Sequence, residues 1–68
     1  MANIVVKNPE ILGGEPVFRG TRVPFSALLD YLENGKPLDE FLADFPSVSR
    51  EEAIAALEEA KSSLMAHL

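Results

Sequence analysis

Apolar residues recur at helical spacing from Pro24 onward, and this periodicity constrains the fold more than any other feature of the chain. In residues 24–34, 38–45 and 50–66 they follow the i, i+3, i+4 pattern of a helix with one buried face. Three such helices fill most of a chain of 68 residues and leave room for one core only. We therefore predict a single domain over residues 1–68.

The ends of these helices carry residues that are typical of helix starts and stops. Pro24 suits a first helical position, and Gly35 suits the position just after a helix. Pro46 predicts the end of the second helix, because the residue before a proline disfavours helical geometry. Ser49 and Glu52 have the spacing of a capping box, which predicts the start of the third helix.

Residues 1–23 look β-like instead. Residues 4–6 are a short β-branched run, and Asn8 with Pro9 is a turn signal. Residues 11–12 and 17–18 are long enough only for ribbon strands. The predicted fold class is mainly α: a short N-terminal β-ribbon followed by a three-helix bundle. Helical spacing does not separate a plain three-helix core from a helix-turn-helix (homeodomain-like) bundle, and composition favours the plain core.

The short ribbon and the small core favour self-association. Two or three such strands do not form an independent sheet, and domains of this size gain stability from disulfides, a metal or oligomerisation. The chain has no cysteine. We therefore expect a homodimer in which the ribbon, at residues 4–6 or 17–18, is shared between the two copies.

The net charge of −5 is unevenly distributed. Residues 1–29 hold three cations and two carboxylates, whereas residues 30–68 hold three cations and nine carboxylates, a net charge of −6. Contact with phosphate is expected in the first part and contact with a basic partner in the second. No apolar run is long enough for a membrane span, and the N-terminus lacks the pattern of a secretion signal. We expect a cytoplasmic protein without a membrane partner.

The segment GGEPVFRGTRVP, residues 13–24, is the first candidate for a binding motif. It differs from a nucleotide-binding phosphate loop, because five residues instead of four separate Gly14 from Gly20 and no lysine precedes Thr21. We expect no cofactor.

The two arginines of this segment have two interpretations. Arg19 and Arg22 can contact a phosphate or an acidic pocket through the planar guanidinium, with Thr21 as an additional donor. Alternatively, they can pair with Asp30 or Glu33 and tie the ribbon to the first helix. The sequence leaves both interpretations open.

Side chains for catalysis or metal binding are scarce. His67 is the only histidine, it lies next to the C-terminus, and it has no cysteine to activate. Three carboxylate pairs are expected on solvent faces or near helix N-termini, where they favour the helix dipole: Asp39-Glu40, Glu51-Glu52 and Glu58-Glu59. We predict neither an enzyme nor a metal site.

The start of the third helix is a second candidate contact region. In helix-turn-helix domains the N-terminal residues of the second helix of the pair approach base edges. Here these residues would be Ser49 and Arg50. The glutamates that follow, Glu51 and Glu52, would face phosphate and disfavour strong DNA recognition.

The string Gly14-x-Pro16-Val17-x-Arg19-Gly20-Thr21-Arg22-x-Pro24, followed by LENGKPLDEFLADFPSVSREEAIAAL, resembles the signature of a prokaryotic family. This family is the domain of unknown function 433, and the resemblance runs from about residue 11 to residue 57. The chain departs from the signature at Glu15, where lysine is common, and at Pro37, where serine is common.

The resemblance implies a helix-turn-helix antitoxin that neutralises a PIN-like ribonuclease toxin encoded nearby, with its own promoter DNA as a further candidate partner. A stand-alone DNA-binding regulator and a small protein-interaction domain without a nucleic-acid role are the alternatives. The residues expected to contact DNA or the partner are Arg19, Thr21, Arg22, Ser49 and Arg50. The apolar residues expected to contact the partner are Leu64, Met65 and Leu68.

Overall fold

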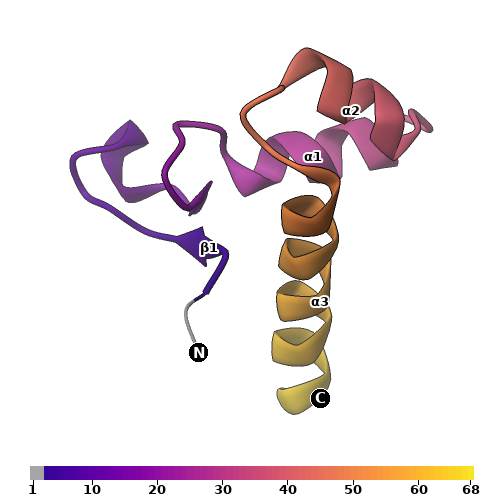
Figure 1. The fold of residues 1–68 in the computed structure, drawn as a ribbon. Helices are drawn as coiled ribbons and strands as arrows, with labels where there is room; N and C mark the ends of the chain where they lie inside the picture. Colours follow the sequence, from indigo (N-terminus) through magenta and orange to yellow (C-terminus); the bar gives the residue numbers. More distant parts are fainter. Residues whose placement is uncertain (1–2) are drawn as a thin grey trace.

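The computed structural model describes residues 3–68, which form a two-stranded hairpin followed by three helices (Figure 1). The elements in chain order are β1 (Val5–Val6), the short 3-10 helix η1 (Leu12–Gly14), β2 (Val17–Phe18), α1 (Phe25–Glu33), α2 (Leu38–Asp44) and α3 (Arg50–Ala66). The predicted fold class, mainly α with a short ribbon ahead of three helices, is confirmed.

The ribbon is antiparallel, with Val5 opposite Phe18 and Val6 opposite Val17. The predicted strand at residues 11–12 is wrong. Leu12 has a φ of 51° and begins η1, and the two glycines that follow also have positive φ values. A strand needs extended backbone, so three successive residues with positive φ turn the chain instead.

The helix ends follow their sequence signals with one correction. Pro24 precedes α1 rather than opening it, because its ψ of 142° is extended. Gly35 follows α1 with a φ of 75° and donates its N–H to the Leu32 carbonyl at 3.0 Å. The capping box is confirmed: Ser49 Oγ accepts from the Glu52 N–H at 3.1 Å, and Glu52 Oε1 accepts from the Ser49 N–H at 2.9 Å.

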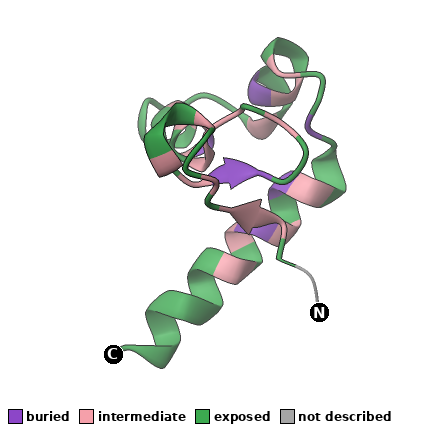
Figure 2. Ribbon diagram, turned by 90° about the vertical axis from the view of Figure 1, so that its left-hand side faces the viewer, coloured by how far each residue is buried: buried purple, intermediate pink, exposed green. Residues whose placement is uncertain are grey.

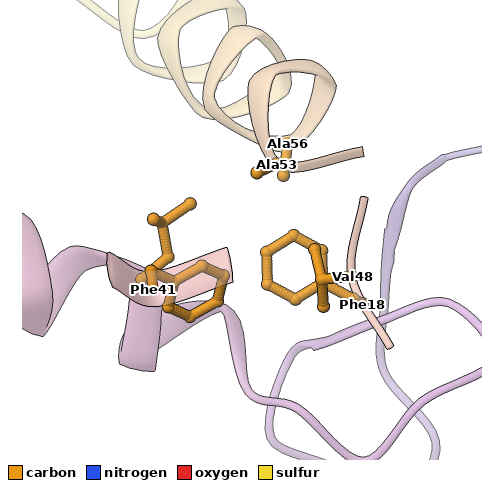
Figure 3. Packing of buried hydrophobic residues seen from close by; sticks show 6 residues of the cluster. Phe18, Phe41, Val48, Ala53 and Ala56 are labelled. Carbon is orange, nitrogen blue, oxygen red and sulfur yellow. The ribbon is translucent and has the colours of Figure 1, made fainter. Parts of the chain in front are cut away.

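The core lies where β2, α1, α2 and the first half of α3 meet (Figures 2 and 3). Phe41 of α2 is fully buried there, and its ring centroid lies 6.1 Å from Phe18, 5.5 Å from Tyr31 and 4.9 Å from Phe45. Small residues of α3 let the helix approach these rings closely. The buried residues are Val17, Phe18, Leu28, Phe41, Val48, Ala53 and Ala56.

The second half of α3 extends beyond the rest of the domain (Figures 1 and 2). Residues 61–68 are all exposed. Leu64 and Leu68 are exposed there, and Ile54, in the first half of the helix, is 46% exposed on the side turned away from the core. The helix is longer than the body against which it packs, so part of its apolar surface has no partner within residues 3–68.

Tyr31 joins α1 to the end of α2 and supplies a test of this packing. Its hydroxyl donates to Asp44 Oδ2 at 2.6 Å. This hydrogen bond, with burial and the nearby charges of Asp44 and Glu40, raises the pKa of the Tyr31 phenol above its ordinary value. We expect Asp44→Asn to move the pKa back toward about 10. Tyr31 is the only tyrosine, so ultraviolet absorbance of tyrosinate measures this titration directly.

The sign of the linked stability effect follows from the direction of the shift. The folded protein holds the phenol proton more tightly than the unfolded chain does, so the contribution is complete below the pKa of an unfolded tyrosine, about 10. It is lost as the pH rises through the higher pKa of the folded state. A Tyr31 that titrates identically in the parent protein and in Asp44→Asn would contradict the hydrogen bond.

Candidate binding surfaces

The turn at residues 19–22 is held rigidly between β2 and α1. The Phe18 N–H donates to the Val23 carbonyl at 2.9 Å, and the Thr21 N–H donates to the Phe18 carbonyl at 3.0 Å. Thr21 Oγ1 donates to the same Phe18 carbonyl at 2.7 Å and accepts from the Val23 N–H at 3.0 Å. Gly20 has a φ of 77°, which favours glycine at this position. The Thr21 hydroxyl therefore closes the turn, and its role as a contact residue stays a prediction.

Arg19 and Arg22 are exposed on this turn. The Arg19 N–H donates to the Ile4 carbonyl at 2.7 Å, so the base of the turn is also anchored to the segment before β1. Among the described residues, neither guanidinium forms an ion pair with Asp30, Glu33 or any other carboxylate. The structure thus presents two cationic side chains from a fixed backbone.

The polar side chains at the start of α3 form hydrogen bonds and an ion pair within the protein. The Ser49 hydroxyl is used in the capping box, and Arg50 forms an ion pair with Asp39 in the first turn of α2. Both partners of the ion pair are largely exposed, so it contributes little to stability. Across residues 3–68, no hydrogen bond or ion pair joins Ser49 or Arg50 to the 19–22 turn. The two predicted contact regions are therefore separate groups.

The C-terminal end of α3 is the most apolar exposed part of the described chain. Leu64 is 63% exposed, Met65 62% and Leu68 88%. The His67 ring nitrogen Nδ1 lies 2.6 Å from the Ser63 carbonyl, within the same turn. Of the predicted partner-binding residues, Leu64 and Met65 lie on the protruding end of α3, and Leu68 follows just beyond it.

Glu59 makes a contact between distant parts of the chain that the sequence does not predict. Its pair with Glu58 was expected on a solvent face, but Glu59 is half-buried and accepts from the Ile4 N–H at 2.5 Å and from the Val5 N–H at 3.4 Å. The carboxylate thus ties α3 to the start of the hairpin. The donors lie more than fifty positions away in the sequence, so no local pattern points to this contact.

Two open clefts flank Glu59. The larger, about 810 Å³, lies between the start of the hairpin and α3 and has Glu58 and Ile4 in its wall. The smaller, about 260 Å³, is walled by Val5, Phe25 and alanines of α3. Because both are shallow surface features beside one carboxylate, they suit contact with a macromolecule better than enclosure of a small molecule.

Residues 3–68 contain no cluster of three or more His, Asp or Glu side chains placed to hold a metal ion. None of the helices in the described part of the chain combines the length and apolar character that crossing a membrane requires.

The two departures from the family signature have local consequences. Glu15 accepts a hydrogen bond from Ser26 Oγ at 2.8 Å and so links the connection before β2 to the first turn of α1. Pro37 precedes α2 in extended geometry, without a side-chain cap. Asp39 and Glu40 occupy the first turn of α2, where their charge favours the helix dipole.

Comparison with known proteins gives a consistent result. A family model described as "Protein of unknown function (DUF433)" matches residues 5–60. The uncharacterized protein y4eO of Sinorhizobium fredii is 42% identical over 48 residues, which are 71% of this chain and 22% of that protein. A crystal structure of a DUF433 member from Anabaena variabilis has a TM-score of 0.76 and 32% identity, and the match covers 88% of this chain and 59% of that one. The chain thus spans about a fifth of the curated relative.

Proposed function

This chain belongs to the DUF433 family of proteins of unknown function, and we propose that it acts as a non-enzymatic, antitoxin-like protein that binds and neutralises a PIN-like ribonuclease. The observation that carries the proposal is the protruding end of α3, where Leu64, Met65 and Leu68 are exposed together. Exposed apolar residues gathered in one place are typical of protein-interaction surfaces.

Charge supports a basic partner for this end of the molecule. Residues 30–68 carry a net charge of −6, and four glutamates lie on α3 itself. A ribonuclease must bind RNA, so parts of its surface are expected to be basic. Opposite charges speed association and weaken it at high salt. We place the main contact on α3, with Arg19 or Arg22 reaching the acidic metal-binding cluster of the ribonuclease.

Deletion of residues 62–68 tests the proposal. These residues are exposed and make no contribution to the core, so the shortened domain should fold. We expect its affinity for the PIN-like ribonuclease encoded beside it to fall by at least about tenfold, because the deletion removes the apolar side chains that bind the partner. Isothermal titration calorimetry and an RNA-cleavage assay provide the measurements.

A matched control uses Leu12→Ala, which removes a half-exposed leucine from the N-terminal segment. This variant should bind and inhibit as the parent does. If the deletion variant inhibits with unchanged affinity and unchanged salt dependence, the contact lies elsewhere and the proposal fails.

DNA binding is the second candidate function, and the exposed arginines of the 19–22 turn favour it. We expect the double variant Arg19→Ala/Arg22→Ala to bind promoter DNA more weakly. The slope of log affinity against log salt should fall by about 0.9 for each phosphate that the variant no longer neutralises. Lys36→Ala is the control, because Lys36 already pairs with Glu40 at 3.5 Å. Equal binding by the double variant and the control would exclude this turn as a DNA contact.

A further inference from the structure

The solvent-facing side of α3 carries a regular row of side chains, which we call the outer seam. Successive members are separated alternately by four and three positions, as in the heptad pattern of a coiled coil, so they lie on one side of the helix. Ala53 and Ala56 are buried on the side that faces the core, whereas every member of the seam is exposed. The outer seam consists of Ile54, Glu58, Lys61 and Met65, and Leu68 follows it just beyond the end of α3.

The order of side chains in the outer seam is self-complementary. When two copies of α3 lie antiparallel with a two-fold axis between positions 59 and 60, Glu58 of one copy faces Lys61 of the other. In the same register Met65 faces Ile54 of the second copy. Opposite charges meet at the centre and apolar side chains meet on both sides of it. We propose that the outer seam binds a second copy of this chain and forms a two-fold dimer of antiparallel α3 helices.

Charge selects this arrangement over its alternatives. A parallel, in-register pair would place Glu58 against Glu58 and Lys61 against Lys61, and like charges at such positions repel. Within one helix Lys61 Nζ already lies 3.9 Å from Glu58 Oε2. In the antiparallel dimer the two pairs join into a network of four alternating charges, which stabilises more than isolated surface pairs do.

The outer seam is also a better dimer surface than the ribbon. Val17 and Phe18 are buried within one chain, and Glu59 accepts from the first amides of the β1 segment. The ribbon therefore has few free edge groups for a second copy. Ile54 and Met65, by contrast, are large apolar side chains left uncovered on a small domain. The same surface patch serves both copies, as a two-fold interface requires.

This inference concerns the protein alone and does not rest on the ribonuclease. Met65 belongs both to the outer seam and to the surface proposed to bind the ribonuclease. A ribonuclease that covers Met65 would therefore displace the second copy of the chain. Measurements on the free protein test the dimer, whereas inhibition of the ribonuclease tests the proposed function, so either can fail without the other.

Charge reversal on the seam gives the experiment. Glu58→Lys puts lysine against lysine at two places in the dimer, and Lys61→Glu puts glutamate against glutamate. We expect each single variant to dimerise about tenfold more weakly than the parent, as measured by sedimentation equilibrium over a concentration series. The double variant Glu58→Lys/Lys61→Glu restores opposite charges and should dimerise within about threefold of the parent.

Mixing the two single variants is the most specific measurement. The lysine introduced at position 58 of the first variant then faces the glutamate introduced at position 61 of the second. At the other contact, Lys61 of the first variant faces Glu58 of the second. Because opposite charges meet at both places, a heterodimer should form about tenfold more tightly than either homodimer.

Glu33→Lys is the control, because it changes the net charge as Glu58→Lys does but at the exposed end of α1, and it should leave the dimer unchanged. A parent protein that stays monomeric throughout the concentration series overturns the proposal. The proposal is also overturned if Glu58→Lys dimerises as tightly as Glu33→Lys. It is overturned as well if the mixture of Glu58→Lys and Lys61→Glu forms heterodimers no more tightly than homodimers.

Discussion

Phe41→Ala is expected to lower the free energy of unfolding by about 3–5 kcal/mol, because it removes a buried ring and leaves a cavity. The ring contacts aromatic side chains from β2, α1 and the end of α2, so no single element can move in to fill the space. A domain of 68 residues is expected to have roughly 3–10 kcal/mol of stability in total. The variant should therefore lose a large share of its stability, and it should be unfolded at room temperature if the parent lies at the lower end of this range.

Urea denaturation followed by far-ultraviolet circular dichroism measures this effect. Leu64→Ala is the matched control, since it also truncates a large apolar side chain on a helix but at an exposed position. Its unfolding free energy should stay within about 0.5 kcal/mol of the parent value. Equal losses in the two variants would mean that the core does not centre on Phe41.

The parts of the fold that were predictable from the sequence depend on local interactions. The start of α3 is an example: Ser49 and Glu52 are three residues apart, and their reciprocal hydrogen bonds need nothing from the rest of the chain. The end of α1 at Gly35 is similar, because a positive φ at that position is a property of glycine itself. Such signals fix where helices begin and end to within about two residues.

Which apolar residues become buried was harder to predict. Periodicity assigns Leu64 to an apolar position of α3, but it does not say how far the packing partners of the helix extend. The hairpin, α1 and α2 cover only the first half of α3, so the later apolar residues stay exposed. Burial depends on the size of the whole domain, and a pattern within one helix carries no information about that size.

The candidate site residues show the same contrast between local features, which the sequence predicts, and long-range contacts, which it does not. Arg19 and Arg22 are exposed, as is usual for charged residues beside a glycine in a turn, and their role as contact residues stays a prediction. The hydrogen bonds of Glu59 were missed, since they depend on how the hairpin approaches α3. Thr21 could have been interpreted better: a threonine hydroxyl that bonds to backbone groups two or three residues away is a common turn motif.

Thr21→Val should destabilise the protein through the 19–22 turn. Valine has nearly the shape of threonine but cannot accept from the Val23 N–H or donate to the Phe18 carbonyl. Both backbone groups are partly buried. Leaving a partly buried donor unpaired costs about 1–3 kcal/mol, and the carbonyl keeps its bond from the Thr21 backbone N–H. We expect a loss of about 2 kcal/mol in the free energy of unfolding, measured by urea denaturation.

Comparison with neighbouring variants shows whether Thr21 is structural or contacts a ligand. Thr21→Ser keeps the hydroxyl and should lose less than half as much stability as Thr21→Val, whereas Arg19→Ala and Arg22→Ala remove only exposed groups and should change it by about 0.5 kcal/mol or less. In binding assays the arginine variants should have the larger effect and the Thr21→Ser variant the smaller one. The arginine variants should lose affinity for DNA or the ribonuclease at unchanged stability, while Thr21→Ser should keep it. A Thr21→Val protein as stable as the parent would mean that the turn is held by its backbone alone, and Thr21 would again be a candidate ligand contact.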